Sequence, residues 1–165
     1  MPTATQKKNI VVQVSDARIS NDPDAVLVTY SLGSCIAVSL YDPAMRLGGM
    51  IHFQLPESEM DPERAKKEPF MFGDTGMDIL IDNLTRHGAE KKRMQVKIAG
   101  GAAMKTGPKG FDIGKRNFLA LRKILWKHGL LSKGHDVGGD MPRNFYLHIN
   151  DGTVIVKAGG IEKTM

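Results

Sequence analysis

Short apolar or alternating runs, bounded by glycine, proline, asparagine or aspartate, recur along the chain and are typical of β-strands. They predict strands at 10–14, 26–30, 35–41, 47–55, 94–99, 145–149 and 153–157. Two longer stretches repeat apolar residues at helical spacing, which predicts helices from Asp74 or Thr75 to His87 and from Asp112 or Gly114 to Trp126. This order of elements indicates an α+β fold with a largely antiparallel sheet and two main helices.

The remaining segments are expected to connect or extend these elements. Residues 15–24 end in turn residues and predict a connector, and residues 136–140 predict a loop. The proline-punctuated, charged segment 56–73 predicts a loop that either borders a site or is an ordinary surface loop. Residues 1–9 and 159–165 are expected to be tails, so a single domain spans 10–158.

A predicted β-hairpin holds Cys35, the only cysteine of the chain. If residues 42–45 form a four-residue loop, Tyr41 faces Arg46 and Cys35 lies directly opposite His52. Directly opposite residues have Cβ atoms about 4.5–5.5 Å apart on one sheet face, which is close enough for a thiol–imidazole pair. A loop one residue longer would turn His52 to the other face.

This register favours Cys35 as a nucleophile and His52 as its base, because a neighbouring histidine activates a thiol. The structural alternative is that a lone cysteine is a small buried hydrophobic residue. His135, beside Asp136, is a second histidine that could serve Cys35, and the register favours His52 over it. Thr29 lies near the end of a predicted strand, and its residue type alone indicates an ordinary strand position.

Composition narrows the class of protein further. The chain has 165 residues, 41% hydrophobic and 25% charged, which is ordinary for a soluble globular domain. The sequence has no long apolar run and no apolar leader, so we expect a cytoplasmic protein without membrane insertion. The net charge of +5 comes from scattered lysines and arginines, and no nucleic-acid recognition motif accompanies them.

The run L-G-S-C-I-A-V-S-L-Y-D-P, followed by G-G-M-I-H-F-Q-L-P, resembles the chemoreceptor glutamine deamidase family, CheD. The resemblance continues in K-I-A-G-G-A-A-M (97–104), I-G-K-R-N (113–117) and D-V-G-G-D-M-P-R (136–143), and covers roughly residues 10–157. The Cys–His–Thr triad of that family falls here on Cys35, His52 and Thr29. The resemblance implies the layered cysteine-hydrolase fold that CheD shares with the catalytic domain of cytotoxic necrotizing factor toxins.

The resemblance also implies an activity, the hydrolysis of glutamine side chains on the cytoplasmic helices of chemotaxis receptors. Cys35 would form a thioester, His52 would move the proton, and Thr29 would orient the imidazole. The backbone N–H groups of Ser34 and Cys35 are the candidates for stabilising the oxyanion. No cofactor or metal is expected, and the resemblance suggests a CheC-type phosphatase as a regulatory partner in some members.

Two other functions remain open from the sequence. One is a weakly active adaptor that binds receptors or a CheC-type phosphatase. The other is a thiol protease or transamidase, which would use the same nucleophile with a different leaving group or acceptor.

Overall fold

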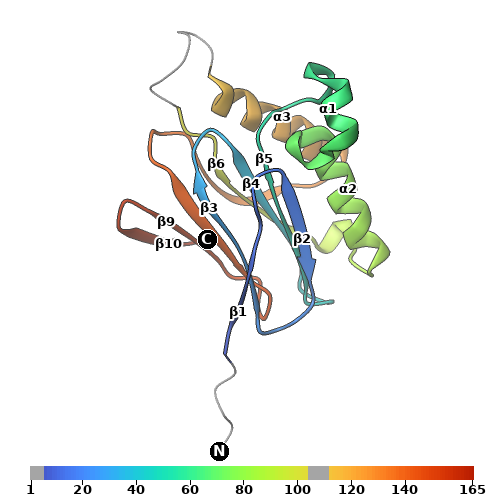
Figure 1. Cartoon of the computed structure of the whole chain (residues 1–165). Coiled ribbons are helices and arrows are strands. Elements are labelled where there is room, and N and C mark those ends of the chain that lie inside the picture. The colour runs from blue at the N-terminus through green and yellow to red at the C-terminus, as the bar shows by residue number, and fades with distance from the viewer. Residues whose placement is uncertain (1–5, 104–111) are drawn as a thin grey trace, which may run out of the picture.

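Two five-stranded sheets, each with one parallel pair of strands, form the body of the molecule (Figure 1). The computed structural model describes residues 6–103 and 112–165; residues 1–5 of the predicted tail and Met104 of the K-I-A-G-G-A-A-M segment lie outside this range. The first sheet has the order β1(Lys8–Val11), β3(Ala25–Leu32), β8(Arg143–His148), β9(Val154–Ala158), β10(Ile161–Thr164). The second has the order β2(Asp16–Ser20), β5(Leu47–Phe53), β4(Ile36–Asp42), β6(Gln95–Gly100), β7(Ser132–Val137).

Alternation along the central strands produces two apolar cores. In β4, Ile36, Val38 and Leu40 join a cluster with the helices, whereas Ala37 and Tyr41 join a cluster between the two sheets. Successive strand residues point to opposite faces, so a fully buried strand such as β4 supplies both cores. The molecule is therefore built in three layers: helices, the second sheet and the first sheet.

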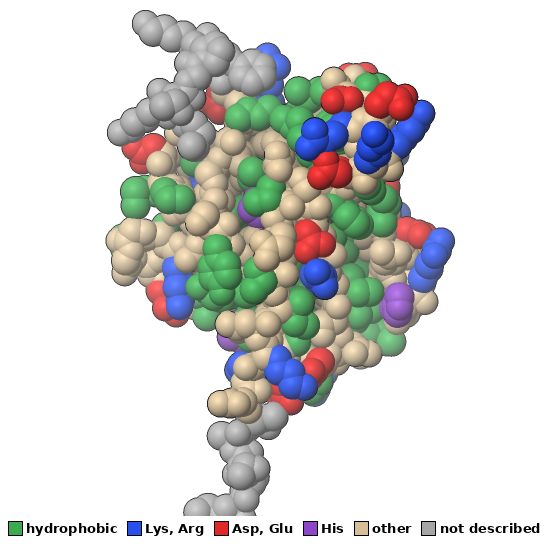
Figure 2. Space-filling model, viewed as in Figure 1, with side chains coloured by type: hydrophobic (Ala, Val, Ile, Leu, Met, Phe, Trp, Pro, Cys, Tyr) green, Lys and Arg blue, Asp and Glu red, His purple; other side chains and the backbone are tan. Residues whose placement is uncertain are grey.

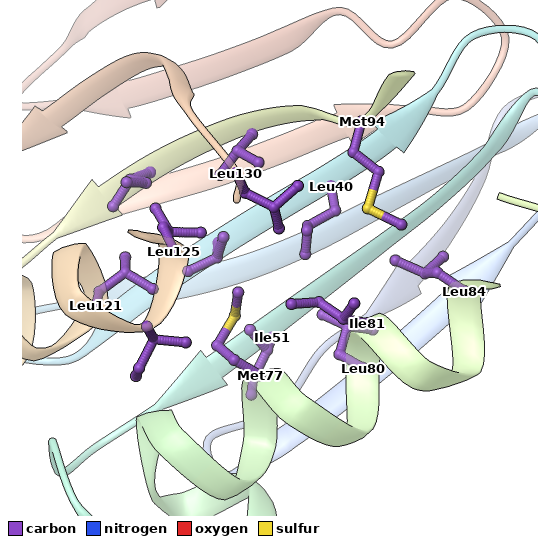
Figure 3. Packing of buried hydrophobic residues seen from close by; sticks show 14 of the residues in the cluster. Leu40, Ile51, Met77, Leu80, Ile81, Leu84, Met94, Leu121, Leu125 and Leu130 are labelled. Atoms are coloured by element: carbon purple, nitrogen blue, oxygen red, sulfur yellow. The ribbon is translucent and has the colours of Figure 1, made fainter. Parts of the chain in front are cut away.

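The helices α2(Gly73–Arg86) and α3(Ile113–Lys127) cover the outer face of the second sheet (Figure 3). In α3, the Asp112 carboxylate accepts the N–H of Lys115 at 3.0 Å and caps the first turn. His87 and His128 follow the last helical residues, which confirms both predicted helices to within a residue or two. No helix in the described ranges is long and apolar enough to cross a bilayer.

Two mixed sheets with helices on one side confirm the α+β fold class, but some local predictions were wrong. The predicted connector contains β2, which pairs with β5, and the predicted loop 56–73 contains the helix α1(Pro62–Lys67). The predicted loop at 136–140 begins inside β7. β1 begins inside the predicted N-terminal tail, and β10 occupies the predicted C-terminal one.

The predicted hairpin forms, but with another register. Ala37, rather than Cys35, pairs with His52, and the last pair before the loop is Asp42 with Leu47. The loop keeps its predicted four residues and begins one residue later, at 43–46. This shift moves the pairing by two residues, which is one full side-chain period, so Cys35 and His52 keep the same face of the sheet.

Charged side chains of both signs lie side by side over α1, in the upper right of the view (Figure 2). Arg64 pairs with Glu68, and Lys66 lies 3.3 Å from Glu63. Exposed pairs of this kind contribute little to stability. This part of the surface is therefore a mixed, solvated surface rather than a basic patch.

Candidate active site

Two strands and the turn before a third strand bring Thr29, His52 and Cys35 to the interface between the two sheets. Thr29 lies in β3 of the first sheet, and His52 lies in β5 of the second. Cys35 directly precedes β4, and its side chain packs against the apolar cluster between the sheets. Thr29 and His52 are each 1% exposed, whereas Cys35 is half-buried. The predicted site residues thus gather where one end of β4 meets the inner face of both sheets.

The Thr29 hydroxyl joins His52 to the first sheet. Its Oγ1 lies 2.7 Å from His52 Nδ1 and 2.7 Å from the carbonyl oxygen of Val12. A carbonyl oxygen only accepts, so the single hydroxyl hydrogen goes to Val12, and Nδ1–H of the neutral imidazole donates to Oγ1. This network leaves the proton on Nδ1 and a lone pair on Nε2.

His52 Nε2 is the free end of this chain of hydrogen bonds. The atom is buried and has no hydrogen-bond partner among the described residues. Buried polar atoms are usually paired, and an unpaired one calls for an explanation such as a catalytic role. The geometry thus leaves a buried nitrogen lone pair that can accept a proton.

The corrected register places Cys35 diagonally across from this imidazole. Cys35 is two residues before Ala37, the partner of His52, and both side chains pack in the cluster between the sheets. Diagonal neighbours on one face are typically about 7–8 Å apart at the backbone and within reach of longer side chains. The strand pairing therefore supports Cys35 and His52 as neighbours, but as a diagonal pair rather than the directly opposite pair that was expected.

Burial sets the charge state of both groups. Burial raises the pKa of the Cys35 thiol, and the backbone of Cys35 itself lowers it by less. Burial also lowers the pKa of His52 to about 4. At neutral pH the resting site therefore holds a thiol and a neutral imidazole rather than a thiolate–imidazolium pair.

The end of β6 holds the turn that carries the cysteine. Gly101 N–H donates to the carbonyl oxygen of Cys35 at 2.9 Å, and Ala102 N–H donates to that of Gly33 at 2.9 Å. Gly100 has φ +113°, and a Cβ at this position would collide with the Cys35 carbonyl. Glycine is therefore required where β6 passes the turn.

Asn117 of α3 is a residue near the site that residue-type reasoning did not single out. Its side chain is fully buried, and Nδ2 donates to the carbonyl oxygens of Ser34 at 3.0 Å and Gln54 at 2.9 Å. It links the turn before Cys35 to the chain just after His52. The only sequence signal was its place in the I-G-K-R-N segment. Helical periodicity does not distinguish a buried asparagine that binds two distant carbonyls from an ordinary polar residue of a helix.

The structure separates the competing histidine from the cysteine. His135 pairs with Ile98 of β6, whose side chain belongs to the cluster on the helix side of the sheet. The imidazole lies against the ring of Phe118 in α3, with 5.5 Å between ring centroids. His135 thus faces the helices, away from the interface between the sheets. Within the described ranges, no three His, Cys, Asp or Glu side chains gather as metal ligands.

Comparison with known proteins adds a relationship along nearly the full length. Residues 54–158 match the family described as CheD chemotactic sensory transduction. A Solibacter usitatus protein named probable chemoreceptor glutamine deamidase CheD is 46% identical, over 96% of this chain and 94% of that protein. Proteins named in the same way are 44% identical in Syntrophus aciditrophicus, over 92% and 95% of the two chains, and 37% identical in Methanococcus maripaludis strain C6, over 93% and 97%.

Proposed function

Because the chain belongs to the CheD family, we propose that it is a chemoreceptor glutamine deamidase that uses Cys35 as its nucleophile. The observation that carries this proposal is the hydrogen bond from His52 Nδ1 to Thr29. It leaves a buried Nε2, without a partner among the described residues, on the sheet face toward which Cys35 packs. A thiol, a base and a group that orients the base are the minimum for thiol-dependent amide hydrolysis.

The first half of the reaction forms a thioester. Cys35 Sγ bonds to the carboxamide carbon of a substrate glutamine while the thiol proton moves to His52 Nε2. The carbonyl π pair moves onto oxygen, and the N–H groups of Ser34 and Cys35 stabilise this oxyanion. The oxyanion then collapses, the C–N bond breaks, and Nε2–H protonates the departing nitrogen, which leaves as ammonia.

The second half restores the enzyme. Water attacks the thioester carbon and gives a proton to His52 Nε2. The C–S bond breaks, the sulfur takes that proton back from Nε2, and the substrate side chain leaves as a carboxylic acid, which gives its remaining proton to water and becomes glutamate. Neither half needs a cofactor.

The resting site makes this a slow reaction. With the pKa of His52 at about 4 and that of Cys35 raised, proton transfer from sulfur to imidazole is uphill. Thr29 holds the imidazole but carries no charge, so it stabilises the imidazolium less than a carboxylate would. We therefore expect turnover well below that of thiol hydrolases with an aspartate or a resting ion pair, and a turnover in their range would contradict this expectation.

The experiment incubates the purified cytoplasmic domain of a chemoreceptor from the same organism with the protein and measures ammonia. We expect one ammonia per glutamate formed, intact receptor chains, and no ammonia with Cys35→Ala. Cleaved receptor chains would indicate a protease, and incorporation of added methylamine would indicate a transamidase. If the well-folded protein binds the receptor domain but releases no ammonia, the result would indicate an adaptor rather than a deamidase.

Regulation by a CheC-type phosphatase stays a prediction from the family resemblance. Ammonia release measured with and without the purified phosphatase tests it.

A further inference from the structure

Three consecutive carbonyl groups before β4 are each held by a donor from outside the turn. Gly33 and Cys35 accept N–H groups from the end of β6, and Ser34 accepts Nδ2 of Asn117. The middle carbonyl is the only one of the three that depends on a side chain. The Ser34–Cys35 peptide therefore owes its orientation to α3.

Fixing that carbonyl also fixes the following N–H. In a trans peptide the C=O and the N–H point in opposite directions, and the described residues include no cis peptide. With the Ser34 carbonyl turned toward Asn117, the Cys35 N–H points away from α3.

The two N–H groups beside the nucleophile are otherwise unused. Within the described part of the chain, no carbonyl oxygen accepts the N–H of Ser34 or of Cys35. An N–H group that is fixed in direction, not accepted by a carbonyl oxygen of the described residues and next to the attacking sulfur is what stabilisation of an oxyanion requires.

The chemistry of Asn117 explains why an amide stands at this position. Both partners of Nδ2 are carbonyl oxygens, so a group with two N–H donors is needed, and the carboxamide cannot be flipped. Its Oδ1 is buried without a partner among the described residues. An unpaired buried acceptor is costly. An apolar residue would remove that cost, but it would also remove the donor to the carbonyl oxygens of Ser34 and Gln54. The cost is understandable if the two donations serve the site.

We propose that Asn117 is a positioning residue of the deamidation reaction, which orients the Ser34–Cys35 peptide so that the Cys35 N–H stabilises the oxyanion. This inference rests on the proposed function. Through Gln54, the same side chain also holds the chain that follows His52, so it fixes the nucleophile and the base relative to each other. The Nδ2 hydrogen bonds of Asn117 go to the carbonyl oxygens of Ser34 and Gln54, so its proposed effect on the reaction is exerted through the peptide that it orients.

The test compares two reactions of Cys35, of which one forms an oxyanion. In the first, a receptor-derived peptide carries an aldehyde in place of the glutamine carboxamide. Sγ adds to the aldehyde carbon, the π pair moves to oxygen, and the thiol proton moves to His52. In the second, Sγ bonds to the methylene carbon of iodoacetamide, iodide leaves, the thiol proton moves to His52, and no oxyanion forms. Only the first reaction depends on an oriented N–H donor.

The variants are Asn117→Ala, Asn117→Ser and a matched control, Tyr41→Phe. Asn117→Ser keeps one hydrogen-bond donor, the serine hydroxyl, and replaces Asn117→Ala in the test if the alanine variant does not fold. Tyr41 Oη donates to the carbonyl oxygen of Ile149 at 2.7 Å, so Tyr41→Phe also removes a buried side-chain hydrogen bond to the backbone, at the opposite end of β4. Thermal unfolding of each variant gives the folded fraction to which all rates are normalised.

Loss of a direct oxyanion donor typically costs about 100- to 1,000-fold, so loss of its orienting group is expected to cost about 10- to 100-fold. We expect Asn117→Ala to weaken aldehyde binding and lower kcat for deamidation by this factor, with KM and the alkylation rate within about threefold of wild type. For Asn117→Ser, aldehyde binding and kcat should lie between the values of the wild type and those of Asn117→Ala. Tyr41→Phe should leave aldehyde binding, kcat, KM and the alkylation rate unchanged. Aldehyde binding as tight as wild type, or alkylation reduced by the same factor, would overturn the proposal for Asn117. A wild-type protein that is alkylated but neither binds the aldehyde nor deamidates would instead contradict the proposed function.

Discussion

Acidification is expected to destabilise this protein through one buried imidazole. His52 is 1% exposed and its pKa is about 4 in the folded protein, against an ordinary value of 6.5. Between these two pH values the unfolded chain binds more protons than the folded one. The free energy of unfolding is therefore highest above pH 6.5, as far as His52 contributes to it, and it decreases as the pH falls toward 4. The linkage relation RT ln[(1+10^(6.5−pH))/(1+10^(4−pH))] gives a loss of about 2 kcal/mol at pH 5 and about 0.2 kcal/mol at pH 7.

The assay is urea unfolding at pH 7, 6 and 5, for the wild type and for His52→Gln. Glutamine does not titrate, and its amide can donate to Thr29 Oγ1 as Nδ1–H does. Carboxylates titrate in both proteins, so the difference between the two pH dependences isolates the histidine. We expect the wild type to lose about 2 kcal/mol more than His52→Gln between pH 7 and pH 5. Parallel pH dependences would refute burial of a neutral imidazole at this site.

Three further predictions concern the residues around the thiol. Thr29→Val leaves the Val12 carbonyl and His52 Nδ1–H unpaired, so we expect a loss of about 2–4 kcal/mol in unfolding free energy. We also expect a lower kcat, which Thr29→Ser should largely restore. An unchanged kcat would mean that Thr29 has no part in the mechanism. Gly100→Ala should abolish ammonia release and reduce the Tm, because its Cβ would displace the Cys35 carbonyl; wild-type activity in this variant would contradict the described turn. The acid limb of kcat/KM should fall near pH 4 rather than 6.5, because His52 stays neutral until then; an acid limb near 6.5 would mean an exposed base.

The hairpin shows how far sequence patterns determined the site. Alternation of side chains and the turn residues predicted both strands, the loop length and the shared face of Cys35 and His52. The register depended on where the loop begins, and Asp42 decided it. Its buried carboxylate accepts the N–H of Ala44 at 3.0 Å and binds Arg93 at 2.8 Å, which keeps Asp42 inside β4. Arg93 is distant in sequence, so a local pattern could not reveal this interaction.

Contacts distant in sequence also explain the other differences. Thr29 lies in a sheet different from that of His52, and only the family resemblance assigned it to the site. The strand β2 is short and half-exposed, and its pairing with β5 rather than its composition makes it a strand. Asn117 looks like any polar helix residue until the two carbonyls that it binds are known.

The most direct test of the account is the mass of each receptor glutamine after incubation in ¹⁸O-labelled water. Hydrolysis through Cys35 predicts a gain of about three mass units at specific glutamines, against about one in ordinary water, and no gain with Cys35→Ala. A gain that persists in Cys35→Ala, or no gain with well-folded wild-type protein, would contradict the thiol-dependent deamidase.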